Sequence, residues 1–321
     1  MTGTPDQAPS RPASRRRLPT WARVLLGGMG LWVATVATTF ATGNPNLVPT
    51  VILLGSFLVP ATFVVYAFGR ADGILTAQRI FLAFICGGVL GVLGASVLEA
   101  TLLPRAFALG YLGVGLIEEA VKLAALWLLA RRLPRYTARD GMVLGAAVGF
   151  GFAALESAGY AFTALFTSGG LSLLDLVETE VLRAVLTPVG HGLWTAILGG
   201  ALFATAGGAR SGRPRPRVAL AGWFLLISVL HALWDAAPGI AGWVTLLLTG
   251  SPAQWFFIRL DQVPGLTAAQ VHLSTALTWA IMGADALLGV LLLVLLRRRH
   301  RPRTAPPTAP PDLVPAMEVV R

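Results

Sequence analysis

Charged residues are scarce in this chain. They make up 12% of its 321 residues, whereas hydrophobic residues make up 55%. A soluble domain carries about 25% charged residues, because water must solvate its surface. The composition therefore excludes an ordinary soluble protein and predicts that lipid surrounds most of the folded chain.

Cysteine and lysine are also rare. Cys86 is the only cysteine, so no disulfide can form within the chain. Lys122 is the only lysine among 25 basic residues, and the arginines lie in short runs between apolar stretches. This distribution of a net charge of +10 is typical of loops that orient a membrane protein, and it does not indicate a nucleic-acid partner. The abundance of Arg, Ala, Gly and Leu favours a bacterial source and hence a bacterial plasma membrane.

Long apolar stretches predict an all-α, polytopic bundle of about eight transmembrane helices. A helix needs about 20 predominantly apolar residues to cross a hydrocarbon core of about 30 Å. Each crossing must be helical, because backbone polar groups in lipid have to be satisfied within the segment. The eight qualifying segments are 22–41, 48–68, 80–98, 106–130, 142–166, 184–206, 218–236 and 273–296.

Arginine-rich loops orient this bundle, because basic loops stay in the cytoplasm. The clusters occupy both ends and alternate connections, at 11–17, 70–79, 131–139, 210–217 and 297–303. The other connections hold only Arg105, Arg183 and Arg259. Eight spans with both termini in the cytoplasm place every cluster on the inner side.

Composition also divides the chain. Residues 1–20 are predicted to form a disordered, basic N-terminal arm, and residues 297–321 a basic, proline-rich cytoplasmic tail. Between them, residues 21–236 form the membrane domain with spans one to seven, and residues 273–296 form the last span.

Residues 237–272 fit this scheme least well. They contain two apolar stretches, Trp243–Leu248 and Trp255–Ile258, with Gly250 and Pro252 between them. A ninth span here would place the arginines of the tail outside. We therefore expect an extracytoplasmic loop with interfacial or re-entrant segments, since Trp favours the headgroup level.

Ionisable side chains lie within the predicted spans, where they are costly and usually functional. They are Glu118, Glu119 and Lys122 in span four, Glu156 in span five, His191 in span six, His231 and Asp235 in span seven, and Asp285 in span eight. Spans four to seven alternate in direction. A rise of 1.5 Å per residue nevertheless puts the first Glu or His of each roughly 8 to 18 Å below the outer surface. We therefore expect these side chains to converge in one layer.

Helical spacing refines this expectation. Lys122 can reach Glu118 or Glu119 one turn away, and Asp235 lies one turn from His231, where a carboxylate orients an imidazole. Glu118 and Glu119 point about 100° apart, so at most one aims fully at a common centre. Gly145, Gly149 and Gly151 in span five predict close helix approach near this layer.

The layer holds more acids than bases. Four carboxylates against one lysine leave an excess of negative charge that a low-dielectric bundle cannot bury unpaired. A divalent cation, bound protons, or both must compensate. Two His and a Glu suit catalytic zinc, and a further Glu can act as general base on water. The arrangement predicts hydrolysis, with water entering from the outer side.

The ordered motifs resemble those of a known family. Glu-Glu-x-x-Lys at 118–122, Phe-x-x-x-Glu at 152–156, His191 in the next span and His-x-x-x-Asp at 231–235 resemble the four motifs of the PrsW family of intramembrane proteases. The resemblance covers about residues 20–240. This family is related to the CAAX prenyl proteases and the bacteriocin-immunity membrane proteases. Their first motif is usually Glu-Glu-x-x-x-Arg, so the shorter spacing here favours the PrsW branch.

The resemblance implies an intramembrane endopeptidase, metal-dependent through Zn²⁺, that cleaves a membrane-anchored protein. In the best-known member the substrate resembles an anti-sigma factor that is cut on the extracytoplasmic side. A single-pass membrane protein of that kind is therefore the expected partner, within the lipid bilayer. A related prenyl protease has been viewed as a metal-free glutamate-type enzyme, so a mechanism without metal stays open.

The resemblance also implies roles for individual residues. Glu118 and Glu119 would supply the water-activating base, and Lys122 would tune them. The predicted metal or oxyanion ligands are Glu156, His191 and His231, and Asp235 would orient His231.

Two other functions compete with proteolysis. An ion- or proton-coupled transporter also uses buried Glu, Asp and His, but it often shows inverted repeats, which are not evident here. A catalytically inactive scaffold would not need all four motifs. Asp285 matches no motif and is interpreted as structural or as lining an aqueous cavity.

Overall fold

A computed structural model describes residues 18–69, 74–103, 110–208, 212–215 and 217–300. The predicted disorder of the N-terminal arm and of the C-terminal tail concerns residues that lie mostly outside these ranges. The ends of the described chain, 18–20 and 297–300, border helices on the arginine-rich side of the molecule.

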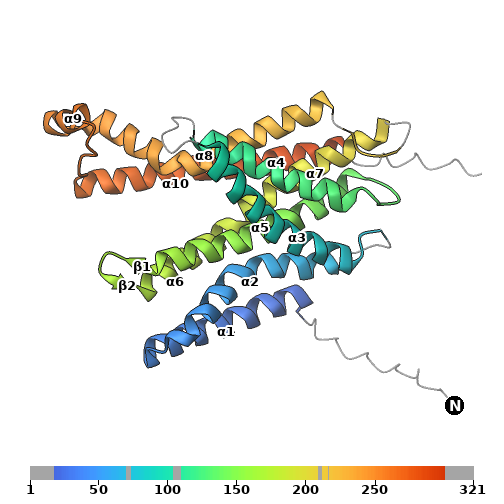
Figure 1. The fold of residues 1–321 in the computed structure, drawn as a ribbon, viewed down its shortest axis with the longest axis horizontal. Helices are drawn as coiled ribbons and strands as arrows, with labels where there is room; N and C mark the ends of the chain where they lie inside the picture. The colour runs from blue at the N-terminus through green and yellow to red at the C-terminus, as the bar shows by residue number, and fades with distance from the viewer. Residues whose placement is uncertain (1–17, 70–73, 104–109, 209–211, 216, 301–321) are drawn as a thin grey trace, which may run out of the picture.

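The described chain is almost entirely helical (Figure 1). Its α-helices are α1 Thr20–Thr42, α2 Val48–Phe68, α3 Ala77–Leu102, α4 Gly110–Ala130, α5 Ala138–Ala164, α6 Leu173–Leu186, α7 His191–Ala204, α8 Val218–Thr249, α9 Pro252–Arg259 and α10 Ala268–Arg299. Three 3₁₀ turns, Pro45–Leu47, Thr187–Val189 and Thr205–Gly208, adjoin them. A small antiparallel hairpin, β1 Phe166–Thr167 and β2 Gly170–Leu171, joins α5 to α6.

Seven segments are long and apolar enough to cross a membrane. They are Thr20–Thr42, Pro45–Phe68, Ala77–Leu102, Ala138–Ala164, Leu173–Ala204, Val218–Thr249 and Ala268–Arg299. Helix α4 has 21 residues but stands apart from these seven, because it carries three ionisable side chains. The predicted all-α polytopic bundle is confirmed, and α4 is its most polar member.

The sixth predicted span has a different outline from the one expected. Residues up to 183 were predicted to lie in an outer loop, but α6 already begins at Leu173. Its apolar positions recur with helical spacing, so they pack against α2 and α5. The helix is interrupted at Thr187–Val189, where Pro188 has no N–H to donate, and it restarts as α7 at His191.

The predicted outer loop 237–272 is also largely helical. Helix α8 continues to Thr249 through Pro238, which the helix accommodates without ending. The apolar stretch Trp243–Leu248 therefore extends α8, and Trp255–Ile258 lies in the short helix α9. Helices α9 and α10 each begin with a capping box, at Ser251 and Gln254 and at Thr267 and Gln270.

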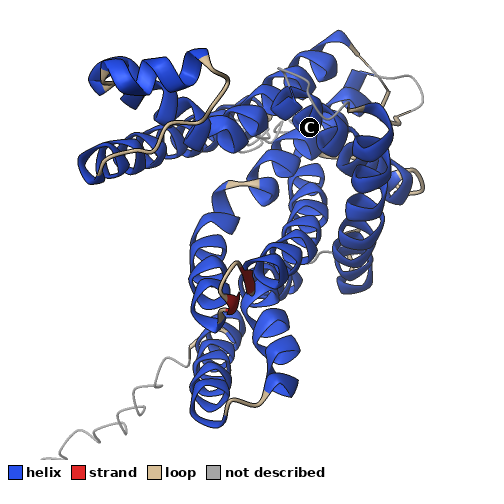
Figure 2. Cartoon of the chain, turned by 60° about the vertical axis from the view of Figure 1, so that its left-hand side comes forward, coloured by secondary structure: helices blue, strands red, loops and turns tan. Residues whose placement is uncertain are grey.

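Helix α5 lies at the centre of the bundle and packs most closely on α7 and α3 (Figure 1). A Cβ at Gly145 or Gly149 would collide with a backbone carbonyl of α7, and one at Gly151 with a carbonyl of α3. The predicted role of these glycines is confirmed. Figure 1 shows α9 and the β-hairpin at the same end of the molecule, and Figure 2 shows that they lie on separate arms.

Candidate active site

Helices α4, α5, α7 and α8 bring the predicted polar residues together. Glu118, Glu119 and Lys122 come from α4, Glu156 from α5, His191 from α7, and His231 and Asp235 from α8. Each side chain lies within 4 Å of at least one other member of the set. The expectation that alternating spans deliver these groups to one layer is therefore confirmed.

Lys122 lies at the centre of the cluster and is fully buried. Its Nζ lies 2.7 Å from Glu119 Oε1 and 3.3 Å from Glu118 Oε2. It also lies 2.9 Å from His191 Nδ1 and 4.2 Å from the centroid of the Phe152 ring. Since an ammonium can only donate, His191 Nδ1 must accept this hydrogen bond. One cation thus contacts two carboxylates, an imidazole and an aromatic face.

The His231 ring is held on two sides. Its Nδ1 lies 3.0 Å from Glu119 Oε1 and donates to that carboxylate, which can only accept. The indole of Trp194 stacks on the ring with centroids 4.7 Å apart. Nε2 then points to Glu118 Oε2 at 3.6 Å and Asp235 Oδ2 at 3.5 Å. The carboxylate that accepts the orienting hydrogen bond belongs to Glu119, whereas the sequence predicted Asp235 for that role.

His191 is oriented in the same way by Glu156. Its Nε2 lies 2.8 Å from Glu156 Oε2, and because Nδ1 accepts from Lys122, Nε2 carries the proton and donates. The first turn of α7 fixes the backbone here, since Gly149 of α5 lies against the His191 carbonyl. Nδ1 faces Glu118 Oε2 at 3.9 Å.

Arg183 is a functional candidate that the sequence reasoning placed in an outer loop. It lies on α6, with Nη2 2.5 Å from Glu156 Oε2 and Nε 2.8 Å from Ser157 Oγ. Its guanidinium lies 4.3 Å from the centroid of the Tyr160 ring. The missed signal is the amphipathic spacing of Leu173–Leu186, which continues as a helix toward His191.

Among the described residues, Glu118, His191 and His231 form a group that can hold a metal ion. Each offers one ligand atom, and these atoms lie within 4.8 Å of one another. Two imidazoles and a carboxylate are the donor set of catalytic zinc. Both imidazoles also have the carboxylate partner that such ligands use, Glu119 for His231 and Glu156 for His191. The residues present therefore fit a divalent metal.

This group differs from the predicted ligand set at one position. Glu118 completes it, whereas the sequence predicted Glu156 beside the two histidines. Glu156 Oε2 instead contacts His191 Nε2 and Arg183. The assignment of Glu156 as a ligand stays a prediction.

The cluster faces an open cavity of about 460 Å³ between α3, α4, α5 and α8. Its lining includes the ionisable side chains Glu99, Glu118, Glu156, Tyr160 and Asp235. Glu99 lies in the last turn of α3, one residue beyond the predicted span 80–98, and was not among the expected site residues. A polar cavity of this size gives water a path to the cluster.

The two adjacent glutamates of α4 have different surroundings. Glu118 lines the cavity, whereas Glu119 is fully buried and one of its oxygens contacts both Lys122 and His231. Both nevertheless lie within 4 Å of Lys122 and His231, so the two glutamates differ in access to the cavity and not in whether they reach the centre of the cluster. Asp285 of α10 is buried too, and neither of its carboxylate oxygens has a hydrogen-bond partner in the described part of the chain.

The fold and the site together define a polytopic membrane protein with a hydrolase-type Glu/His/His centre. A family model for the PrsW family intramembrane metalloproteases matches residues 19–260, and the chain belongs to this family. It is therefore a multi-pass membrane endopeptidase of the metal-dependent kind that acts on a membrane protein, which decides against the transporter alternative. No curated protein and no solved structure matches the chain significantly.

Proposed function

We propose that the protein hydrolyses a peptide bond of a single-pass membrane protein near the extracytoplasmic face of a bacterial plasma membrane. The observation that carries this proposal is the grouping of Glu118, His191 and His231 at a water-accessible cavity. The cavity residues lie in the last turns of α3 and the first turns of α4. With both termini inside, these turns belong to the outer half of the membrane.

We propose Zn²⁺ as the metal, held by Glu118, His191 and His231. The hydrogen-bond pattern supports this set, because Glu156 and Glu119 take the protonated nitrogens and leave His191 Nδ1 and His231 Nε2 as the basic ones. Bound there, Zn²⁺ would supply a Lewis acid that polarises a carbonyl and makes water more acidic. His191 Nδ1 cannot accept from Lys122 and bind a metal at once, so Lys122 would then keep its contact with Glu119.

Glu119 and Lys122 act as positioning residues in this scheme. Both are fully buried, so neither touches water or substrate directly. Glu119 holds the proton of His231 Nδ1, and Lys122 offsets part of the negative charge of the two glutamates. Their buried ion pair keeps the cluster compact in a low-dielectric bundle.

The general base follows from access to the cavity. Of the two glutamates predicted for this role, only Glu118 lines the cavity. If Glu118 binds metal, Asp235 is the cavity carboxylate that faces His231 Nε2, at 3.5 Å, and it is placed to take the proton of the attacking water. In a metal-free glutamate mechanism Glu118 itself takes that proton. The metal content of the active enzyme distinguishes the two.

The opening of the cavity bears on the nature of the substrate. The cavity beside the cluster is open, and residues of α3, α4, α5 and α8 line it. An extended segment of another membrane protein could enter there from the bilayer. An anti-sigma factor is proposed on the family resemblance alone.

The decisive experiment compares membrane proteomes of cells that carry the wild type and Glu118→Gln. One single-pass protein should accumulate uncut in the variant. Glu178→Gln is the matched control, because Glu178 is exposed on α6 and the chemical change is the same. If no membrane protein differs between wild type and Glu118→Gln, the site assignment is wrong.

Metal analysis of the purified chain tests the ligand set separately. Wild type and Glu178→Gln should hold one zinc per chain, and His231→Asn and Glu118→Gln should lose it. Loss of zinc in Glu156→Gln with retention in Glu118→Gln would restore the originally predicted ligand set. Full activity of a metal-free preparation would establish the glutamate mechanism instead.

A further inference from the structure

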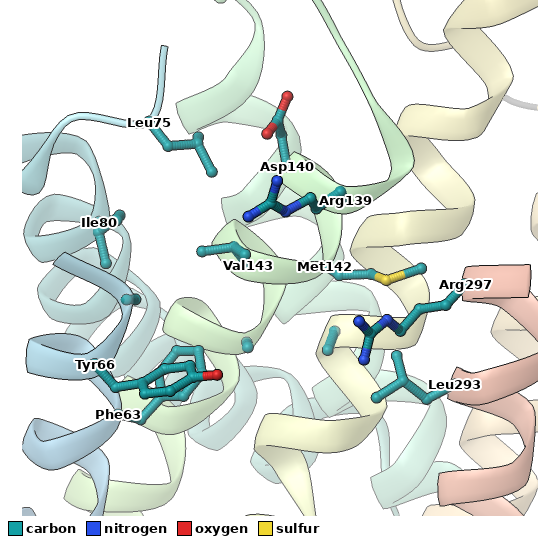
Figure 3. A pocket seen from close by; sticks show the side chains of 13 residues that line it. Phe63, Tyr66, Leu75, Ile80, Arg139, Asp140, Met142, Val143, Leu293 and Arg297 are labelled. Carbon is teal, nitrogen blue, oxygen red and sulfur yellow. The ribbon is translucent and has the colours of Figure 1, made fainter. Parts of the chain in front are cut away.

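A second pocket lies at the opposite, arginine-rich end of the bundle (Figure 3). It has a volume of about 290 Å³ and lies between α2, α3, α5, α7 and α10. Its nearest residue on α5, Ala146, is about 15 Å along the helix from Glu156. The pocket is therefore separate from the proteolytic site.

The walls of this pocket are mainly apolar. They include Phe63 and Ala67 of α2, Ile80 of α3, and Val143 and Leu293 of α5 and α10. Exposed apolar side chains such as Val294 continue this surface outside the pocket. In a membrane such a surface faces lipid, so an occupant can enter sideways from the bilayer.

Two arginines stand at the rim. Figure 3 shows Arg297 extending from α10 toward α5, and Arg139 extending from the first turn of α5 toward α2 and α3. Neither guanidinium has a hydrogen bond or ion pair with any residue in the described part of the chain. An adjoining space of about 310 Å³ shares both arginines and adds Arg298 and His300. Guanidinium groups that have no partner among the described residues and lie above an apolar pocket complement a phosphate that carries apolar chains.

One acid lies in the same pocket. Asp140 is 5% exposed, and its Oδ2 has no hydrogen-bond partner among the residues that the structure describes. A buried carboxylate oxygen of this kind accepts a hydrogen bond when a donor is present. It therefore suits a headgroup that carries a hydroxyl beside its phosphate. Since three arginines outnumber this acid, the occupant must still be anionic.

We propose that this pocket binds an anionic phospholipid of the cytoplasmic leaflet with a hydroxyl-bearing headgroup. Arg139 and Arg297 contact the phosphate, Asp140 accepts from the headgroup hydroxyl, and an acyl chain packs against Phe63 and Leu293. The bound lipid bridges α5 to α10, which have few other contacts at this end. The site is independent of the proteolytic chemistry proposed above.

The test measures binding of dioleoylphosphatidylglycerol to the purified full-length chain in detergent, by native mass spectrometry and by thermal unfolding. Wild type should bind this lipid and unfold at a higher temperature. Arg139→Gln/Arg297→Gln should bind it at least about tenfold more weakly, because the variant loses both charge-assisted contacts to the phosphate. The control Arg132→Gln/Arg299→Gln removes the same charge from the same end, outside both spaces, and should bind within about twofold of wild type.

Two further measurements test whether the pocket and the intact lipid are both needed for binding. Val143→Trp fills the pocket but keeps both arginines, and it should also lose binding. Inorganic phosphate or glycerophosphoglycerol should not replace the intact lipid. The proposal is overturned if dioleoylphosphatidylcholine or dioleoylphosphatidylethanolamine binds as tightly, if the control double variant loses as much, or if Val143→Trp binds normally.

Discussion

Helices α5 and α7 pack in a different way from helices α8 and α10. In α7 every residue from Gly192 to Phe203 is buried, whereas in α10 only Gln270, Asp285, Gly289 and Leu296 are. The α5–α7 pair has glycines at its contact, so the two backbones touch. The α8–α10 pair presents large aliphatic side chains to lipid. Because lipid provides no hydrophobic drive between helices, small residues decide which helices come close.

This difference divides the site into two halves. His191 and Glu156 lie on the tightly packed pair, where the backbone itself fixes their positions. His231 lies on the more exposed helix α8, and it depends on Glu119 and on the stacked ring of Trp194. We therefore expect backbone substitutions to damage the first half and loss of a single hydrogen bond to damage the second.

The largest effect is expected from Gly149→Leu. Its side chain would collide with the His191 carbonyl, and overpacking of this kind costs about 3 kcal/mol or more. The variant should unfold at a much lower temperature in detergent. Gly222→Leu on α8 is the control, because nothing lies within 4 Å of a Cβ there, and it should change stability by less than about 0.5 kcal/mol. Equal effects of the two would remove the contrast between the helix pairs.

The second-largest effect is expected from loss of the carboxylates that accept hydrogen bonds from the two histidines. Glu119→Gln should weaken metal binding and cleavage by about 10- to 100-fold, as the loss of a partner behind a ligand does elsewhere. Glu156→Gln should cost less metal affinity, because Gly149 still fixes the backbone at His191. Zinc affinity by competition with a chelating dye checks both. A larger loss of zinc affinity in Glu156→Gln than in Glu119→Gln would show that α8 is held as firmly as α7.

Arg183→Gln is expected to have a smaller effect, about tenfold on cleavage. Arg183 orients Glu156 from outside the metal group, so the loss should appear in kcat while zinc content stays at wild-type level. Arg183→Lys should restore part of the activity, since it keeps the charge but not the second hydrogen bond to Ser157. A loss of zinc in Arg183→Gln would place Arg183 in the metal-binding machinery and contradict this role.

The smallest effect is expected from Leu291→Ala on α10. Leu291 is 50% exposed toward the lipid side, so its loss should change the unfolding temperature and cleavage very little. Leu198→Ala on α7 is the contrasting variant, because Leu198 is fully buried and its truncation should cost about 2 to 5 kcal/mol. Similar costs for both would mean that α10 is covered by something other than lipid.

The residues that converge are those that the sequence predicted, but some of their hydrogen-bond partners differ from the predicted ones. The convergence of the Glu and His residues was expected because depth in a membrane follows directly from position along a helix. The partners of His231 and the place of Glu118 in the metal group were not, since they depend on the rotation of α4 and α8 about their axes. Arg183 was missed because the composition of α6 is typical of an outer loop.

The sequence by itself determined the all-helical class, the gathering of the arginines at alternate connections and the set of polar residues that converge between the helices. Lipid forces each apolar stretch to form a helix, and each helix converts residue number into depth. Only the tertiary structure decided which carboxylate supports which histidine, how Arg183 reaches Glu156, and that Arg139 and Arg297 share one pocket. These features depend on how helices distant in sequence turn and pack against one another, and depth carries no information about that.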